Sequence, residues 1–86
     1  MPKLTPFEKV VLLKFYGLVK GGLKGHPPEE AIKSKFRSDQ RGYVSATLKK
    51  LRRKGLIREH PTRGGITYEL TVEGRDIAKR LQKDLE

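Results

Sequence analysis

The stretch that decides the fold is residues 38–57, SDQRGYVSATLKKLRRKGLI. Val44, Leu48 and Leu51 recur at the spacing of a single helical stripe, so this segment predicts a helix with one apolar face. Gly55 follows the last helical positions, and a glycine just past a helix end is typical of a left-handed terminal turn. Six other positions carry a positive charge: Arg41, Lys49, Lys50, Arg52, Arg53 and Lys54. The helix is therefore expected to hold a core on one side and to offer positive charge on the other.

Two helices are expected before this one. Residues 5–8, Thr-Pro-Phe-Glu, have the pattern of a capping box with proline in the first turn, and they predict a helix over about residues 6–19. Residues 27–30, Pro-Pro-Glu-Glu, predict a second helix start, because acidic side chains there complement the positive end of the helix dipole. A polar turn follows, in which Ser38 or Asp39 is expected to cap the third helix.

After the third helix the apolar pattern changes from a helical period to alternation. Residues 58–61 and 66–70 predict two short strands that form a β-hairpin. Alternation places Ile66, Tyr68 and Leu70 on one face of the second strand. A final amphipathic helix is expected from its apolar positions, which are Ile77, Ala78, Leu81 and Leu85.

The length and the charge of the chain limit its organisation and its partners. With 86 residues, the chain is expected to form a single domain, residues 1–86, around one modest core. The formal charge is +10, and it is uneven: the first 57 residues carry 14 Lys and Arg against four Asp and Glu, whereas the rest carry six of each. This excess favours a nucleic acid as partner before an anionic membrane surface. The alternative is a Lys-rich surface that only keeps the protein soluble.

Other features exclude several classes of protein. The chain has no cysteine, so neither a disulfide nor a thiolate metal site can form. No apolar run is long enough to span a bilayer and no signal-peptide pattern is visible, so we expect a cytoplasmic protein without a membrane partner. The absence of Asn among many charged residues favours a heat-adapted source.

Catalysis finds little support in the sequence. His26 and His60 are the only histidines, and neither forms a metal-ligand spacing with carboxylates along the chain. Ser34 and Ser45 have no base nearby in sequence that would activate them as nucleophiles. We therefore expect no enzymatic activity, no catalytic residues, no cofactor and no metal.

The predicted order of elements resembles a winged helix-turn-helix domain, most closely the compact prokaryotic regulators of the MarR-like and PadR-like kind, with an archaeal source expected. The resemblance covers about residues 5–86. The last matching positions form a strand that ends in the pattern Leu-Thr-x-x-Gly. The matching residues are Val44, Ser45, Leu48, Leu51, Gly55, Leu56, Ile57, Tyr68, Leu70, Thr71 and Gly74.

This resemblance implies a mainly helical fold with a small β-hairpin: a three-helix core, a wing and a C-terminal helix. It also implies a DNA-binding protein that regulates transcription. The third helix, about residues 39–54, would enter the major groove of double-stranded DNA, and the hairpin of residues 58–71 would serve as the wing. Members of this superfamily usually dimerise through terminal helices, so a homodimer through the C-terminal helix, involving Leu85, is expected as well.

Candidate nucleic-acid contacts lie on the outer side of the third helix, in the basic segment before it and at the hairpin tip. Gln40 and Arg41 can read adenine or guanine, while Tyr43 can reach bases or phosphates. Arg63 can enter a minor groove, although an ordinary hairpin turn also explains the glycines beside it. For Arg41, the alternative is a side chain at the helix start that is only solvated. The full candidate set is Lys33, Lys35, Arg37, Gln40, Arg41, Tyr43, Ser45, Lys49, Lys50, Arg53 and Arg63.

Two alternatives to DNA binding follow from the same features. An RNA-associated or ribosome-associated winged-helix protein would use the same basic face, because fold alone does not decide function. A protein-interaction module would instead dock another subunit through an exposed apolar patch near Leu85 or Tyr16.

Overall fold

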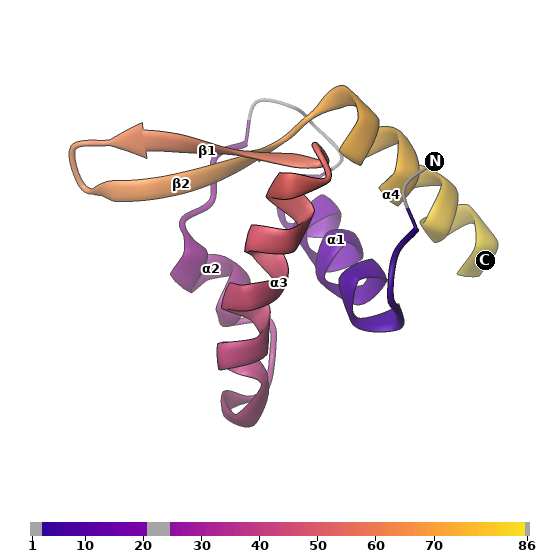
Figure 1. The fold of residues 1–86 in the computed structure, drawn as a ribbon, viewed down its shortest axis with the longest axis horizontal. Coiled ribbons are helices and arrows are strands. Elements are labelled where there is room, and N and C mark those ends of the chain that lie inside the picture. The colour runs from indigo at the N-terminus through magenta and orange to yellow at the C-terminus, as the bar shows by residue number, and fades with distance from the viewer. Residues whose placement is uncertain (1–2, 21–24, 86) are drawn as a thin grey trace.

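The structure, a computed structural model, describes residues 3–20 and 25–85. The described chain is mainly helical with one antiparallel β-hairpin, in the order predicted from the sequence (Figure 1). The structure has one element that the sequence did not predict, a short 3-10 helix before the third α-helix. The elements are α1 (Pro6–Leu18), α2 (Glu29–Lys33), η1 (Ser38–Gln40), α3 (Arg41–Arg53), β1 (Ile57–Thr62), β2 (Gly65–Leu70) and α4 (Val72–Leu85).

Helix α1 holds the other helices together. It packs against α2, α3 and α4, and α3 in turn packs against α2 and the start of β1. The hairpin runs across one end of the helices, and its tip projects beyond them, while α4 leaves on the other side of the molecule (Figure 1). One long arm of the fold is therefore free of helical neighbours.

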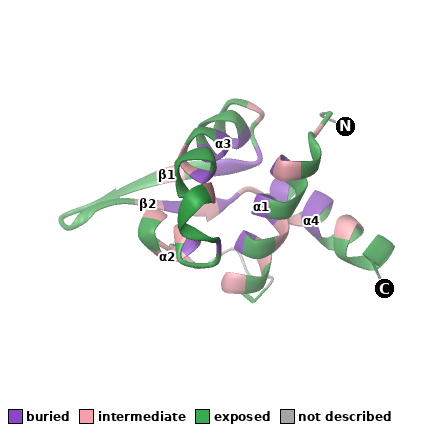
Figure 2. Cartoon of the chain, turned by 90° about the horizontal axis from the view of Figure 1, so that it is seen from below, coloured by how far each residue is buried: buried purple, intermediate pink, exposed green. Residues whose placement is uncertain are grey.

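The buried hydrophobic side chains of the described residues form one cluster. Figure 2 shows that they lie on the inward sides of the helices, whereas the outer half of the hairpin is exposed. The predicted stripe of the third helix is confirmed, since its three members are fully buried. Full burial of such a side chain contributes about 1.5–3 kcal/mol. The cluster consists of Val11, Leu12, Phe15, Ile32, Phe36, Val44, Leu48, Leu51, Leu56, Ile57, Tyr68, Leu70, Ile77 and Ala78.

The start of α1 is tied to the end of α3 through a buried carboxylate. The predicted capping box is present: the Thr5 hydroxyl accepts from the Glu8 backbone N–H, and Glu8 Oε1 accepts from the Thr5 N–H at 2.8 Å. The second carboxylate oxygen of Glu8 accepts a hydrogen bond from Lys54 Nζ at 2.7 Å. Lys54 also donates to the carbonyl of Lys3. Glu8 thus joins two helices that are far apart in the sequence.

The entry into α3 differs from the sequence prediction. Neither Ser38 nor Asp39 caps this helix; its N-cap residue is Gln40, which is already helical and makes no side-chain cap hydrogen bond. The reason is that residues 38–40 form η1, which curls the backbone before α3 begins. Asp39 instead accepts a hydrogen bond from the Arg37 guanidinium.

The β-hairpin that the sequence predicted is present, with β1 and β2 antiparallel. Ile57 pairs with Leu70 at its base and Thr62 with Gly65 at its tip. Of the three residues predicted to share one face of the second strand, Tyr68 and Leu70 are buried, but Ile66 is 50% exposed because the helices do not reach that far along the arm.

A third segment joins the hairpin along β2. The Tyr68 N–H donates to the Pro27 carbonyl at 2.9 Å, and Pro28 forms an antiparallel bridge with Thr67. The chain just before α2 therefore lies alongside β2, as a short third strand would.

The pattern Leu-Thr-x-x-Gly at the start of α4 has a direct structural explanation. The Thr71 hydroxyl accepts from the Gly74 N–H at 3.0 Å and donates to the Gly55 carbonyl at 2.7 Å. Gly55 has φ of 77°, which confirms the predicted left-handed turn. Gly74 is buried, and a Cβ there would overlap the Leu56 carbonyl oxygen. The threonine caps α4, and the glycine lets α4 approach the turn that follows α3.

The substitution Gly74→Ala should destabilise the fold by about 1–3 kcal/mol, because the new methyl group meets backbone that cannot yield. Gly42→Ala is the matched control: a Cβ at this helical glycine has no neighbour within 4 Å. It should stabilise the protein by about 0.5–1 kcal/mol through helix propensity. Urea unfolding followed by circular dichroism measures both changes, and a Gly74→Ala chain as stable as the wild type would contradict the close approach.

Acid should weaken the link between α1 and α3. Burial opposes ionisation of Glu8, but the hydrogen bonds from Lys54 and Thr5 and the charge of Lys54 outweigh it, so the pKa of Glu8 lies below its ordinary value of 4.5. A group whose pKa is lower in the folded state stabilises the fold above the unfolded pKa, and this contribution is lost as the pH falls through the folded pKa. We expect the free energy of unfolding of the wild-type chain to fall below about pH 4.5.

The variant Glu8→Gln keeps a capping side chain and removes the charge. It should lose about 1.5–3 kcal/mol of stability at neutral pH, the range for hydrogen bonds to charged groups. The fall of its free energy of unfolding in acid should also be smaller, because the contribution of Glu8 is missing. Glu73→Gln, at an exposed carboxylate of α4, should follow the wild-type curve. Urea unfolding at a series of pH values makes the comparison, and an unchanged acid dependence in Glu8→Gln would refute this role.

Candidate nucleic-acid interface

Helix α3 turns one side to the core and the opposite side to solvent. Thr47 joins the three predicted core residues on the buried side, where its hydroxyl donates to the Tyr43 carbonyl at 2.7 Å. The opposite side is a row of exposed residues about one helical turn apart. This row consists of Gly42, Ala46, Lys49 and Arg53.

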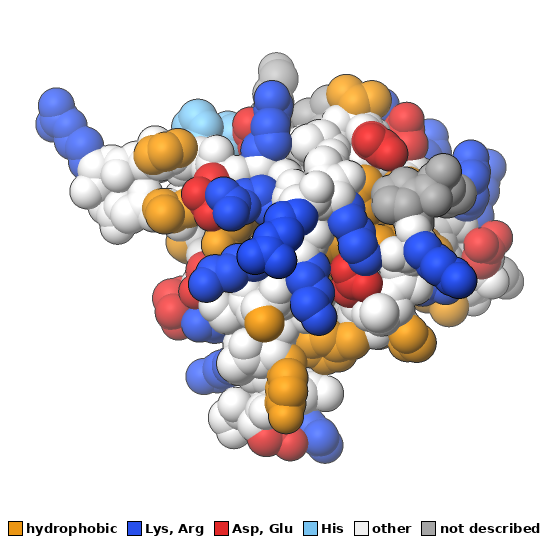
Figure 3. All heavy atoms as spheres, viewed as in Figure 1, with side chains coloured by type: hydrophobic (Ala, Val, Ile, Leu, Met, Phe, Trp, Pro, Cys, Tyr) orange, Lys and Arg blue, Asp and Glu red, His pale blue; other side chains and the backbone are white. Residues whose placement is uncertain are grey.

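Four exposed cations of α3 form what we call the basic face: Lys49 and Arg53 on the exposed row, and Arg41 and Lys50 on its two flanks. Within residues 3–20 and 25–85, no carboxylate oxygen lies within the 4.0 Å ion-pair distance of these four side chains. Figure 3 shows Lys and Arg side chains gathered over α3. Their charge is therefore available to an external anion, because none of the described carboxylates pairs with it.

Two other candidates, Lys33 and Ser45, are engaged inside the fold by one carboxylate of α2. Glu29 forms an ion pair with Lys33 Nζ at 3.2 Å and accepts a hydrogen bond from the Ser45 hydroxyl at 3.0 Å. The Tyr68 hydroxyl lies 3.5 Å from the same carboxylate. Sequence reasoning missed this cluster, which joins α2, α3 and β2. Contact of Lys33 or Ser45 with nucleic acid stays a prediction, although both side chains already have internal partners.

The tyrosine of this cluster remains a donor over a wide pH range. Burial raises the pKa of Tyr68 above its ordinary value, and the negative charges of Glu29 and Glu59 raise it further. The hydroxyl is therefore protonated at neutral pH and can donate to the Glu29 carboxylate.

Three further candidates, Arg37, Gln40 and Tyr43, lie around the amino-terminal end of α3. Arg37 pairs with Asp39 at 3.3 Å, but both side chains are largely exposed, so this pair contributes little and Arg37 stays accessible. Gln40 is half-buried, whereas Lys35 is exposed beside α1, where it lines a hollow with Lys14. Tyr43 is 70% exposed, and it lines a hollow together with Gln40. The structure thus brings Arg37, Gln40 and Tyr43 beside Lys50 of the basic face, but it does not bring Lys35 there.

The hairpin carries its accessible charge at the tip. Arg63 is exposed in the turn between the strands, and Gly65, the first residue of β2, has φ of 132°. At the base of the hairpin, by contrast, Arg58 pairs with Glu69 at 3.1 Å and Arg52 of α3 pairs with Glu59 at 3.4 Å. Figure 3 shows the basic side chain of the tip standing apart from those over α3.

The far side of the molecule is different in character. Leu85 is 76% exposed at the end of α4, and together with residues of α1 it lines a hollow between these two helices.

None of the helices within the described ranges combines the length and the apolar composition needed to cross a bilayer.

Comparison with known proteins adds information on the fold. No protein-family model matches the chain, and no curated protein matches it. Among solved structures, the chain is similar to the crystal structure of AF1382 from Archaeoglobus fulgidus, with a TM-score of 0.74 and 22% sequence identity. The match covers 95% of this chain and 88% of that one. At this identity the likeness supports the arrangement of helices and hairpin and says nothing of activity.

The carboxylate that joins α2, α3 and β2 should matter for stability. Glu29→Ala leaves Lys33 without its closest partner and Ser45 without its acceptor, so we expect a loss of about 1–3 kcal/mol in the free energy of unfolding. Glu30→Ala, at the exposed neighbouring position, should cost less than about 1 kcal/mol. Thermal and urea unfolding measure the difference. Equal losses in both variants would remove the special role of Glu29.

Proposed function

We propose that this protein binds double-stranded DNA as a winged helix-turn-helix protein and regulates transcription. The observation that carries the proposal is the basic face of α3, where four exposed cations have no carboxylate partner among the described residues while the opposite side of the same helix is fixed in the core. A helix held in this way presents its charge at a constant angle. That is what recognition of a regular phosphate polymer requires.

The order of elements supports the winged-helix interpretation. Helices α2 and α3 are joined through η1, and the hairpin follows α3 directly. The segment of residues 27–28 lies alongside β2, which adds a third strand-like stretch midway along the proposed wing. The Glu29 cluster holds α2, α3 and β2 together, so a helix in a groove and a wing beside it would keep their relative position.

The exposed row of α3 suits insertion into a major groove. Its amino-terminal half carries only small side chains, Gly42 and Ala46, so the backbone can come close to base edges there. Space around Gly42 is open, which means that packing within the chain does not require a glycine. Lys49 and Arg53 follow on the same row, where they would contact the phosphates that flank the groove.

Two further groups complete the proposed interface. Arg41 is the first residue of α3 and would be the reader of base edges, because recognition helices contact bases with their amino-terminal residues. Arg63 at the projecting hairpin tip would contact the backbone or enter a minor groove, where the negative potential attracts arginine. Dimerisation through the exposed Leu85 of α4 would place two such units on one DNA site and remains a prediction.

The test is a charge reversal with a matched control. Lys49→Glu combined with Arg53→Glu should lower the affinity for duplexes of any sequence by about 10–100-fold at low salt, and should reduce the slope of log affinity against log salt by about 2. Lys79→Glu combined with Lys83→Glu makes the same change in net charge on exposed positions of α4, and should have a much smaller effect. Fluorescence anisotropy of labelled duplexes over a salt series measures both.

Two outcomes would contradict the proposal. Equal losses in the two double variants would mean that net charge alone drives binding and that α3 has no special role. Structured RNA that displaces the duplex at lower concentrations than unlabelled duplex DNA would favour the RNA-associated alternative instead.

A further inference from the structure

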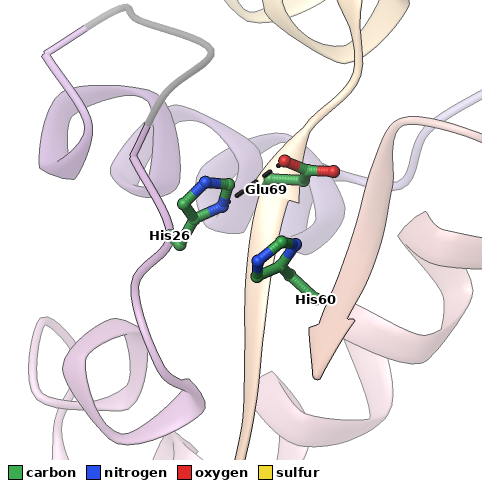
Figure 4. A group of neighbouring side chains, drawn as sticks. All are labelled: His26, His60 and Glu69. Atoms are coloured by element: carbon green, nitrogen blue, oxygen red, sulfur yellow. Dashed lines mark ion pairs between the residues drawn. The ribbon is translucent and has the colours of Figure 1, made fainter. Parts of the chain in front are cut away.

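Three side chains that are distant in the sequence meet on the outer face of the hairpin: His26, His60 and Glu69 (Figure 4). Arg58 pairs with Glu69 across the hairpin, and residues two apart in a strand share a face, so His60 and Glu69 lie on the same face. Extension of the bridge between Pro28 and Thr67 by two residues brings His26 opposite Glu69. The two imidazoles therefore approach Glu69 from the two neighbours of β2.

The geometry of this cluster is close and accessible. His26 Nδ1 lies 3.4 Å from a carboxylate oxygen of Glu69, and the two imidazole rings stack with centroids 4.3 Å apart. One candidate ligand atom from each of the three residues lies within 4.8 Å of the others. Both histidines are exposed and the Glu69 side chain is mostly covered, so the imidazoles can turn while the carboxylate keeps its place.

We propose that His26, His60 and Glu69 bind one divalent transition-metal ion of the zinc type. Two imidazole nitrogens and one carboxylate oxygen are a ligand set that Zn²⁺ accepts, with solvent in the fourth position. Bonds of about 2.0–2.2 Å in a tetrahedron put neighbouring ligand atoms about 3.4 Å apart. His26 Nδ1 and Glu69 already have this separation, and the other pairs exceed it by at most about 1.4 Å, so rotation of one ring out of the stack brings the lone pairs together.

A neighbouring cation orients the carboxylate for this role. Arg58 holds the other oxygen of Glu69 at 3.1 Å, which leaves the oxygen nearest His26 directed at the imidazoles. Hydrogen-bonded partners behind a metal ligand commonly fix its orientation in this way.

The bound metal would act as a structural clip. Its ligands come from the segment before α2, from β1 and from β2, so one ion would fasten the hairpin to the chain that leads into α2. The site lies on the face of the hairpin opposite the buried Tyr68, away from the hydrophobic core. This inference does not depend on DNA binding, and the two can fail separately.

Isothermal titration calorimetry of the full chain with ZnCl₂ tests the proposal. We expect binding of one ion per chain in the wild type and in Glu73→Gln, whose carboxylate lies on α4. The affinity for zinc should fall by about 100-fold in His26→Ala, His60→Ala and Glu69→Gln. Loss of a residue that only supports a metal ligand costs about 10–100-fold, and loss of a ligand itself should reach the upper end of this range. Zinc at about ten times its dissociation constant should raise the melting temperature of the wild type by about 6 °C or more.

Two readouts keep the test decisive. Circular dichroism of each variant without metal shows whether it is folded, and the imidazole ¹⁵N resonances of the wild type should shift for both histidines on titration with zinc. No zinc binding by the folded wild type, binding that survives in both folded histidine variants, or a shift of one histidine alone would overturn the proposal and leave only two stacked imidazoles beside a carboxylate.

Discussion

Burial of the apolar stripe of α3 is the constraint on which the rest of the structure depends. Val44, Leu48 and Leu51 are completely buried, and α3 packs against α1, α2 and β1. Exposure of these three side chains by rotation of the helix would cost several kcal/mol in lost burial. The side of α3 that faces the core therefore determines which side faces solvent. Hydrophobic packing thus fixes the orientation of the basic face.

Two carboxylates reinforce this orientation at different points of α3. Glu8 of α1 accepts a hydrogen bond from Lys54, just past the end of the helix, and Glu29 of α2 accepts one from Ser45 near its start. Both acids also serve their own helices: Glu8 closes the capping box of α1, and Glu29 lies in the first turn of α2. These internal ion pairs use Lys33 and Lys54, while the cations on the outward side of α3 remain accessible.

Local rules explain which parts of the fold could be predicted from the sequence. The capping box at Thr5, the stop at Gly55 and the apolar stripe of α3 depend on residues close in the chain, and all were confirmed. The expected caps at Ser38 and Asp39 were wrong, because the backbone there forms η1 before α3 begins. Ile66 has the alternation of a core residue but lies on an arm beyond the helices, and no local pattern reports how far the helices reach.

The sequence by itself determined the order of the elements, the apolar side of α3 and the uneven distribution of positive charge, because these follow from short-range periodicity and composition. Only the tertiary structure decided which polar side chains meet. The contacts of Glu29 with Ser45 and Tyr68, and the group formed by His26, His60 and Glu69, join segments that are distant in the sequence. Such groups depend on how strands and helices pack in three dimensions. The spacing of residues along the chain does not predict that packing.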